Sequence, residues 1–258
     1  MKKGEGKDSM SDFRAGAHLK KQIGDVRWRT LIDSANTGKV KVLLDTLGRT
    51  VFYTLLSDEE VVAWIIKYAK KSKAKARQFL LSMRQQARMR GVADTIRIFV
   101  EVQHGCLFKR DVPKMGPTWD DFKYLQNWKF SDPETEHALL TWIPVPIDNS
   151  FNKNVAEQMG VVQSFKSVAA IPEWCALSFG SINHVSGLAL AHFNATGKDP
   201  FNGLFVRTDT GYSGSCRLEL DWGGSRLDCG RWGWDAYRGS DVAVFVMGVV
   251  KALGSACR

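Results

Sequence analysis

The stretch "CRLELDWGGSRLDCGRW", residues 216–232, decides the fold of the second half of the chain. Apolar and charged side chains alternate over "CRLELDW", which places Cys216, Leu218, Leu220 and Trp222 on one face of a strand. The glycines of "GGS" then turn the chain, and "RLDCGRW" can pair back on the first segment. The pattern predicts an antiparallel β hairpin.

Strand and helix patterns divide the rest of the chain. "LFVRTD" precedes the hairpin, and "DVAVFVMGVV" follows it as an apolar run typical of a strand covered on both faces. Upstream, Ser57 and Glu60 have the spacing of a capping box, which predicts a helix over residues 58–71, and a second helix continues to Gly91. We therefore predict an α+β fold with a helical basic N-terminal half, a mixed region and a C-terminal antiparallel β unit.

Other segments give weaker signals. Residues 12–35 have a helical pattern, and residues 39–56 have that of a hairpin turning at Gly48. "TIRIFVEVQ", residues 95–103, alternates as a half-buried strand does. "DPETEHALLTW", residues 132–142, predicts a helix with a proline in its first turn.

The chain has 258 residues, of which 44% are hydrophobic, so it is long enough for one large domain or two small ones. Prolines, a glycine and a change in charge balance predict a boundary near residues 111–117. We expect a flexible arm over residues 1–11, a basic and mainly helical domain or subdomain over residues 12–115, and an α+β domain over residues 116–258.

Positive charge is concentrated before that boundary. The net charge of the chain is +9, and residues 1–115 carry 24 Lys and Arg against 12 Asp and Glu, whereas residues 116–258 carry 12 against 15. A field of this sign favours a polyanion or an anionic membrane surface as partner.

A basic stripe lies on the second predicted helix. Apolar residues at helical spacing form its packed face, and Lys73, Arg77, Arg84 and Arg88 form a neighbouring stripe, which Lys70 joins if the helix begins earlier. Residues 67–90 contain nine basic side chains and no acidic one. Cations at this spacing can follow a phosphate backbone, which predicts RNA or DNA as a partner; the alternative is a solvated helix face.

Two residues are candidate nucleophiles. Gly211-Tyr212-Ser213-Gly214 is similar to the pattern around the nucleophile of chymotrypsin-like proteases, although glycine- and serine-rich turn chemistry also explains the segment. "IPEWCALSF" is similar to a tryptophan-cysteine-alanine stretch of NlpC/P60 and CHAP amidases, and it places Cys175 near a predicted helix start. The alternative for Cys175 is a buried, unreactive thiol.

Metal and export signals are weak. The five cysteines form no C-x-x-C pair, the spacing of Cys175, His184 and His192 matches no zinc signature, and we predict neither a metal nor a cofactor. No apolar run approaches the roughly 20 residues that cross a bilayer, and the N-terminus lacks the apolar segment of an export signal. These features predict an intracellular protein, cytoplasmic or nucleoid/nuclear, with reduced thiols.

Together these observations predict a non-enzymatic nucleic-acid-binding protein that contacts phosphates through a basic helix. Its charge layout is that of a packaging or nucleoprotein component, including viral-type ones, and it leaves the second half free for self-association. The alternatives are a hydrolase that uses Ser213 or Cys175, and a protein-interaction scaffold without catalytic activity.

Overall fold

The structure is a computed structural model that describes residues 52–253, except for the side chains of residues 232–234. Residues 51–258 form one compact unit. Residues 1–51 and 254–258 lie outside the described range. The arm predicted over residues 1–11, the helix over residues 12–35 and most of the hairpin over residues 39–56 therefore lie outside the described residues.

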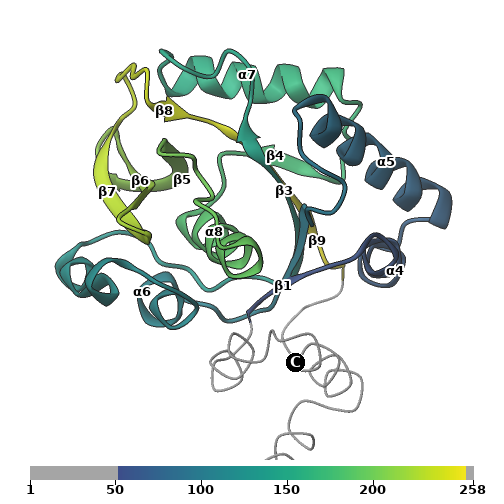
Figure 1. Cartoon of the computed structure of the whole chain (residues 1–258), viewed down its shortest axis with the longest axis horizontal. Coiled ribbons are helices and arrows are strands. Elements are labelled where there is room, and N and C mark those ends of the chain that lie inside the picture. Colours follow the sequence, from purple (N-terminus) through teal and green to yellow (C-terminus); the bar gives the residue numbers. More distant parts are fainter. Residues whose placement is uncertain (1–51, 254–258) are drawn as a thin grey trace, which may run out of the picture. The chain divides into compact units, whose positions relative to one another are not determined.

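An antiparallel sheet of five strands forms the centre of the described unit (Figure 1). Its order is β1-β2-β3-β9-β4, and the strands are β1 (Tyr53–Leu55), β2 (Phe99–Val102), β3 (Ala138–Pro146), β4 (Ala176–Ser178) and β9 (Phe245–Lys251). Along β3, Leu139 and Ile143 belong to the core on one face, whereas Leu140 and Trp142 belong to the core on the other. The sheet is thus buried on both sides, which explains its long apolar strands.

Three helices cover one face of this sheet. They are α4 (Asp58–Tyr68), α5 (Lys73–Met89) and α7 (Val155–Val168), and their apolar side chains share one core with the sheet. Ser57 caps α4 in the capping box that its spacing with Glu60 predicts. The buried face of α5 consists mainly of Ala76, Phe79, Leu80, Met83 and Ala87, as the helical spacing predicts.

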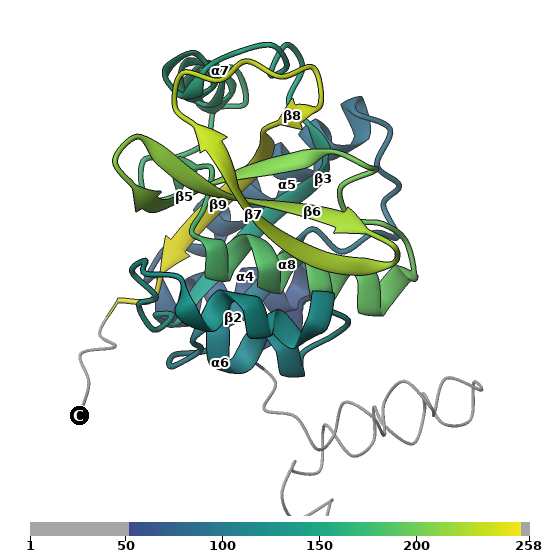
Figure 2. The same cartoon turned by 90° about the vertical axis from the view of Figure 1, so that its left-hand side faces the viewer.

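The other face of the sheet packs on helix α8 (Ile182–Thr196), which lies between the five-stranded sheet and a second sheet (Figure 1). The second sheet has the order β7-β6-β5-β8 and contains β5 (Phe205–Ser213), β6 (Cys216–Gly223), β7 (Arg226–Trp234) and β8 (Val242–Ala243). β5, β6 and β7 pair in antiparallel fashion, and β8 pairs parallel to β5 (Figure 2).

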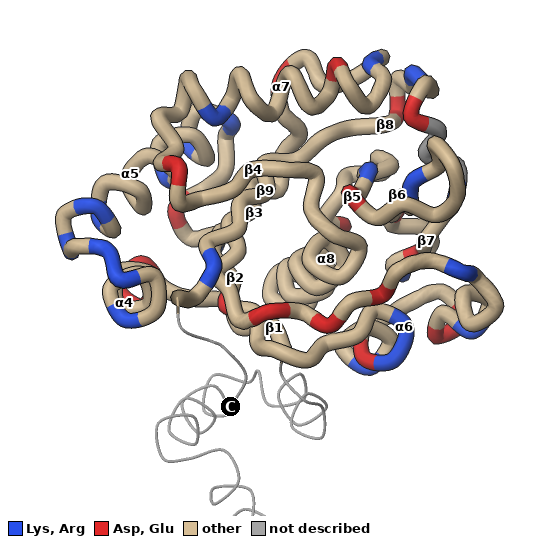
Figure 3. Tube along the Cα trace, turned by 180° about the vertical axis from the view of Figure 1, so that it is seen from behind, with Lys and Arg blue, Asp and Glu red and all other residues tan. Residues whose placement is uncertain are grey.

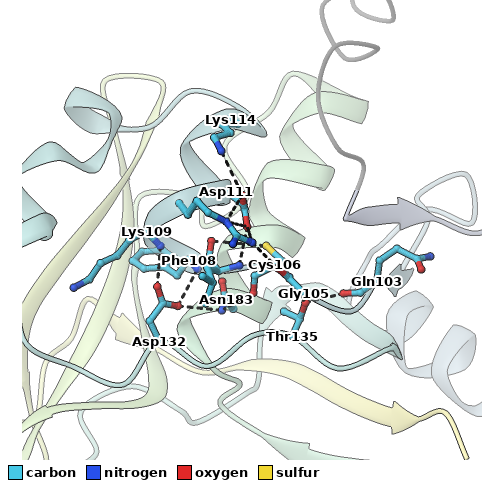
Figure 4. A network of polar contacts seen from close by, with 12 residues as sticks. Gln103, Gly105, Cys106, Phe108, Lys109, Asp111, Lys114, Asp132, Thr135 and Asn183 are labelled. Carbon is cyan, nitrogen blue, oxygen red and sulfur yellow. Dashed lines mark hydrogen bonds and ion pairs between the residues drawn. The ribbon is translucent and has the colours of Figure 1, made fainter. Parts of the chain in front are cut away.

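A polar network secures the segment between β2 and β3, which contains α6 (Phe108–Asp111) and the 3₁₀ helices η1 (Val112–Lys114) and η2 (Trp119–Asn127). Asp132 accepts hydrogen bonds from the backbone N–H groups of Phe108 and Lys109, at 2.9 and 3.1 Å. The side-chain amide of Asn183 in α8 donates to a carboxylate oxygen of Asp132 at 3.3 Å (Figure 4). It also donates to the carbonyl oxygen of Pro133 at 3.0 Å. The network therefore fastens α6 and the loop after η2 to α8.

The structure confirms the predicted α+β class and the hairpin at residues 216–232. Cys216, Leu218, Leu220 and Trp222 are all buried, as their alternation predicts. None of the helices in the described part of the chain is both long and apolar enough to cross a bilayer.

One prediction for the middle of the chain needs correction. The helix expected over residues 132–142 is wrong, because its apolar end belongs to β3, a strand whose two faces are covered by different cores. Apolar runs of this length do not distinguish a buried strand from a buried helix. The boundary expected near residues 111–117 stays a prediction, and β2 and β3, on either side of it, pair directly.

Candidate nucleic-acid interface

The turn between α4 and α5 gathers three cations of the predicted stripe, Lys70, Lys73 and Arg77. α4 ends at Tyr68, and Ser72 caps α5 by accepting a hydrogen bond from the backbone N–H of Lys75 at 3.3 Å. Lys70 has a φ of 53°, a left-handed conformation that a lysine seldom adopts, and this reverses the chain within a few residues. The tight turn thus brings Lys67, at the end of α4, and the first cations of α5 into one short segment.

We call this feature the basic corner, and it consists of Lys67, Lys70, Lys71, Lys73, Lys75 and Arg77. Lys71 is half-buried and the other five side chains are exposed. Figure 3 shows the basic positions following one another along the end of α4, the turn and the start of α5. Six cations thus fall within eleven residues of one exposed turn.

The positive charge of the basic corner is not neutralised by direct ion pairs in the described part of the chain. None of the six cations forms an ion pair with a residue of the range 52–253. The ammonium of Lys67 lies 4.6 Å from the centre of the Tyr68 ring, and its interaction with Tyr68 raises its pKa. Lys73 and Arg77 line a groove of about 460 Å³ with Asp58 and Glu59. The corner therefore carries a net positive charge, partly offset on its α4 side.

The structure divides the predicted stripe into an exposed part and a paired part. Lys70, Lys73 and Arg77 belong to the basic corner. Arg84, in contrast, is only 7% exposed and binds Asp58, which comes from the start of α4. Arg88 remains exposed, but its Nε atom lies 2.7 Å from a carboxylate oxygen of Asp94.

Helical spacing alone does not separate the exposed cations of the stripe from the paired ones, because the acidic partners of Arg84 and Arg88 lie elsewhere in the sequence. Asp58 and Asp94 both lie outside the acid-free window of residues 67–90 and reach α5 only through the tertiary fold. A surface built from the structure therefore keeps Lys70, Lys73 and Arg77 and adds Lys67, Lys71 and Lys75 from the turn. The half-buried Lys71 lies outside the stripe, and only the turn geometry identifies it.

A cavity of about 540 Å³ adjoins the basic corner. It lies beside β4, which is an edge strand of the five-stranded sheet, and the start of α8 and the end of β9 also line it. Lys71 and Ala69 line it from the α4–α5 turn, and Trp174 and the apolar side chains of Val249 and Leu253 form much of its wall. A mostly apolar cavity of this size, with a few polar groups, is typical of small-ligand sites.

Besides Lys71, Glu173 and Lys251, four polar side chains line this cavity: Ser178, Ser181, His184 and Asp209. Each serine hydroxyl accepts one backbone hydrogen bond, and Asp209 accepts one from the backbone N–H of Gly180 at 2.9 Å. Burial lowers the pKa of His184 to about 4, so its imidazole is neutral at pH 7. The cavity therefore offers hydrogen-bonding groups without a charged histidine.

The structure places the two candidate nucleophiles in different surroundings. Ser213 is exposed at the end of β5 and pairs with Cys216 across a two-residue turn. Most of "TDTGYSGSC" therefore belongs to strands and not to the loop expected there. Cys175 is fully buried, and burial raises its pKa to about 12. An activated thiol requires a lowered pKa, so the surroundings of Cys175 are those of a core residue.

The described range contains no preformed metal site. Within residues 52–253, no three His, Cys, Asp or Glu side chains lie close enough together to bind one metal ion.

Comparison of the chain with known protein families, characterised proteins and solved structures finds no match. The geometry of the site itself is therefore the basis for a functional proposal.

Proposed function

We propose that this protein binds nucleic acid by contacting phosphates with the basic corner. The observation that carries the proposal is the set of six cations between Lys67 and Arg77, of which five are exposed and none is paired with a described acidic residue. Most charged helix faces are simply solvated, but they usually mix both signs. A surface whose charged side chains are all positive over a whole turn favours the binding of a polyanion.

The conformation of the corner adds to this support. Because Lys70 holds a strained backbone conformation between two capped helices, the cations on either side of it come from rigid elements rather than from a mobile tail. Charges held in place lose less conformational entropy when they bind a phosphate backbone. The corner is thus a fixed set of positive charges on a folded scaffold.

Binding of this kind is independent of sequence, because phosphate contacts position a nucleic acid but do not read its bases. Such contacts suit a packaging or nucleoprotein component, in which one protein covers many different sequences. The hydrolase alternative has less support, since the buried thiol of Cys175 has a raised pKa.

The experiment that tests the proposal measures the affinity of the full-length protein for short single-stranded and double-stranded oligonucleotides at increasing salt. Displacement of counterions by cations makes log affinity fall linearly with log salt, by about 0.9 per phosphate contact on duplex DNA and about 0.7 on single strands. We expect a steep slope for both probes. No binding at low salt, or an affinity independent of salt, would contradict the proposal.

A further inference from the structure

We infer that the cavity beside β4 takes an unpaired base of a single-stranded nucleic acid whose phosphates lie along the basic corner. This inference rests on the proposed function and extends it from nucleic acid in general to single strands. It also assigns Trp174 as the surface on which that base stacks.

The cavity and the basic corner are continuous through Lys71. This residue belongs to the α4–α5 turn and lines the cavity together with Trp174. Trp174 also lines a second hollow of about 280 Å³, together with Lys75 and Gln78 of α5. The indole therefore borders two hollows, each with a lysine of the basic corner at its edge, so a strand bound to the corner passes directly by the ring.

The cavity is suited to a base rather than to a phosphate. Two cations line it, Lys71 and Lys251, but so do two acids, Asp209 and Glu173, so its lining carries no net charge apart from histidine. A phosphate placed inside would meet a carboxylate at close range, whereas a neutral base would not. Phosphates are instead favoured outside the cavity, along the basic corner, whose six residues are all positively charged.

The wall of the cavity provides both stacking and hydrogen bonds. The Trp174 ring is held by an edge contact with Phe79, with ring centres 4.9 Å apart. Among the described residues, no acceptor binds the hydroxyl hydrogens of Ser178 and Ser181, and nothing binds the ring nitrogens of His184. These groups are available to the edge of a base that stacks on the indole.

A duplex cannot use this cavity, because its bases are paired and stacked inside the helix. Stacking of one base on an aromatic side chain contributes enough free energy to change affinity by about 5-fold to 100-fold. This contribution adds no cation, so it leaves the salt dependence of binding unchanged. Loss of Trp174 and loss of the basic corner therefore have different signatures.

The test compares Trp174→Leu with the wild-type full-length chain, using an oligonucleotide as a single strand and the same sequence as a duplex. We expect the variant to bind the single strand about 5-fold to 100-fold more weakly, to bind the duplex within about 2-fold of the wild type, and to keep the same salt slope. Trp119→Leu is the matched control, since Trp119 is 50% exposed and lies on η2, away from the cavity lining.

Two further variants keep the test decisive if loss of the Trp174–Phe79 contact impairs folding. Trp174→Phe retains an aromatic ring and is expected to restore most of the single-strand affinity. Ala176→Ile adds bulk at an exposed β4 residue that lines the cavity, and it is expected to weaken single-strand binding as Trp174→Leu does.

Each outcome decides the matter. Selective loss of single-strand affinity in Trp174→Leu and Ala176→Ile supports the inference. Unchanged single-strand affinity, or equal loss for both probes in folded variants, overturns it while leaving the proposed function intact. If the wild-type protein binds neither probe, the proposed function itself fails, and this inference fails with it.

Discussion

Arg84 and Asp58 form a partly buried ion pair in which the Nη2 atom of the guanidinium lies 2.5 Å from Oδ1 of the carboxylate. The Nη1 atom of the same guanidinium donates to the carbonyl oxygen of Ile96 at 2.7 Å. One side chain therefore joins α5 to the start of α4 and to the segment that leads into β2. This relationship assigns Arg84 to the scaffold and not to the basic corner.

Removal of the Arg84 side chain should lower the stability of the protein and leave nucleic-acid binding unchanged. We expect Arg84→Ala to lower the free energy of unfolding by about 1–3 kcal/mol, because it removes buried hydrogen bonds and packing while Asp58 stays partly solvated. Urea denaturation measures this change. The control is Arg77→Ala on the exposed side of the same helix, for which we expect a change within about 0.5 kcal/mol. Equal stability of the two variants would contradict the assignment.

A second prediction concerns the close contact between α8 and β1. A Cβ atom added at Gly187 would overlap the ring of Tyr53, whose hydroxyl donates to the carbonyl oxygen of Asn183 at 2.8 Å. We expect Gly187→Ala to destabilise the protein by about 1–3 kcal/mol through overpacking. Thermal unfolding followed by circular dichroism checks this.

Gly160 in α7 provides the matched control. It also lies within a helix, but nothing lies within 4 Å of an added Cβ atom. Gly160→Ala should stabilise the protein by about 0.5–1 kcal/mol, since alanine is the better helix former. A loss of stability in this control as large as that at Gly187 would show that the contact with Tyr53 is not the cause.

The buried imidazole of His184 makes stability depend on pH. Its charged neighbours are Glu136, Asp209 and Lys251, and burial lowers its pKa to about 4 against an ordinary value of about 6.5. Between these values the unfolded chain binds a proton that the folded chain does not. The contribution of His184 is therefore fully present above about pH 6.5 and is lost as the pH falls toward 4.

We expect the difference in unfolding free energy between the wild type and His184→Gln to shrink on acidification through this window, by about 1–3 kcal/mol. Subtraction of the variant removes the contributions of other titrating groups, such as His192, whose pKa burial also lowers. Denaturation at a series of pH values measures this difference. A difference that is constant from pH 7 to about 4 would contradict the buried, neutral state of His184.

Much of the fold follows from local patterns. The capping box at Ser57 and the alternation from Cys216 to Trp222 each depend on a few neighbouring residues, and the structure confirms both. β3 does not follow from local patterns, because its first six residues are all buried, in cores on both faces of the sheet, and so show no alternation. Its identity as a strand depends on pairing with β2 and β9, which are distant in sequence.

The candidate site is predictable from sequence only in part. The absence of acids from residues 67–90 indicates the basic corner, but the pairing of Arg84 and Arg88 depends on acids that the fold supplies from outside this window. The cavity has no sequence signature, since Lys71, Trp174 and His184 come from three separate segments. Their proximity is a property of the tertiary structure alone.

The most direct test of the central claim is the salt dependence of duplex DNA binding by a variant of the basic corner. Lys70, Lys73 and Arg77 are replaced together by alanine, and the control replaces three other exposed cations, Lys129, Lys198 and Arg226. Both variants lose the same charge. We predict that the corner variant binds more weakly and that its slope of log affinity against log salt falls by about 2–3, whereas the control keeps the wild-type slope. Equal slopes in the two variants would contradict phosphate binding at the basic corner.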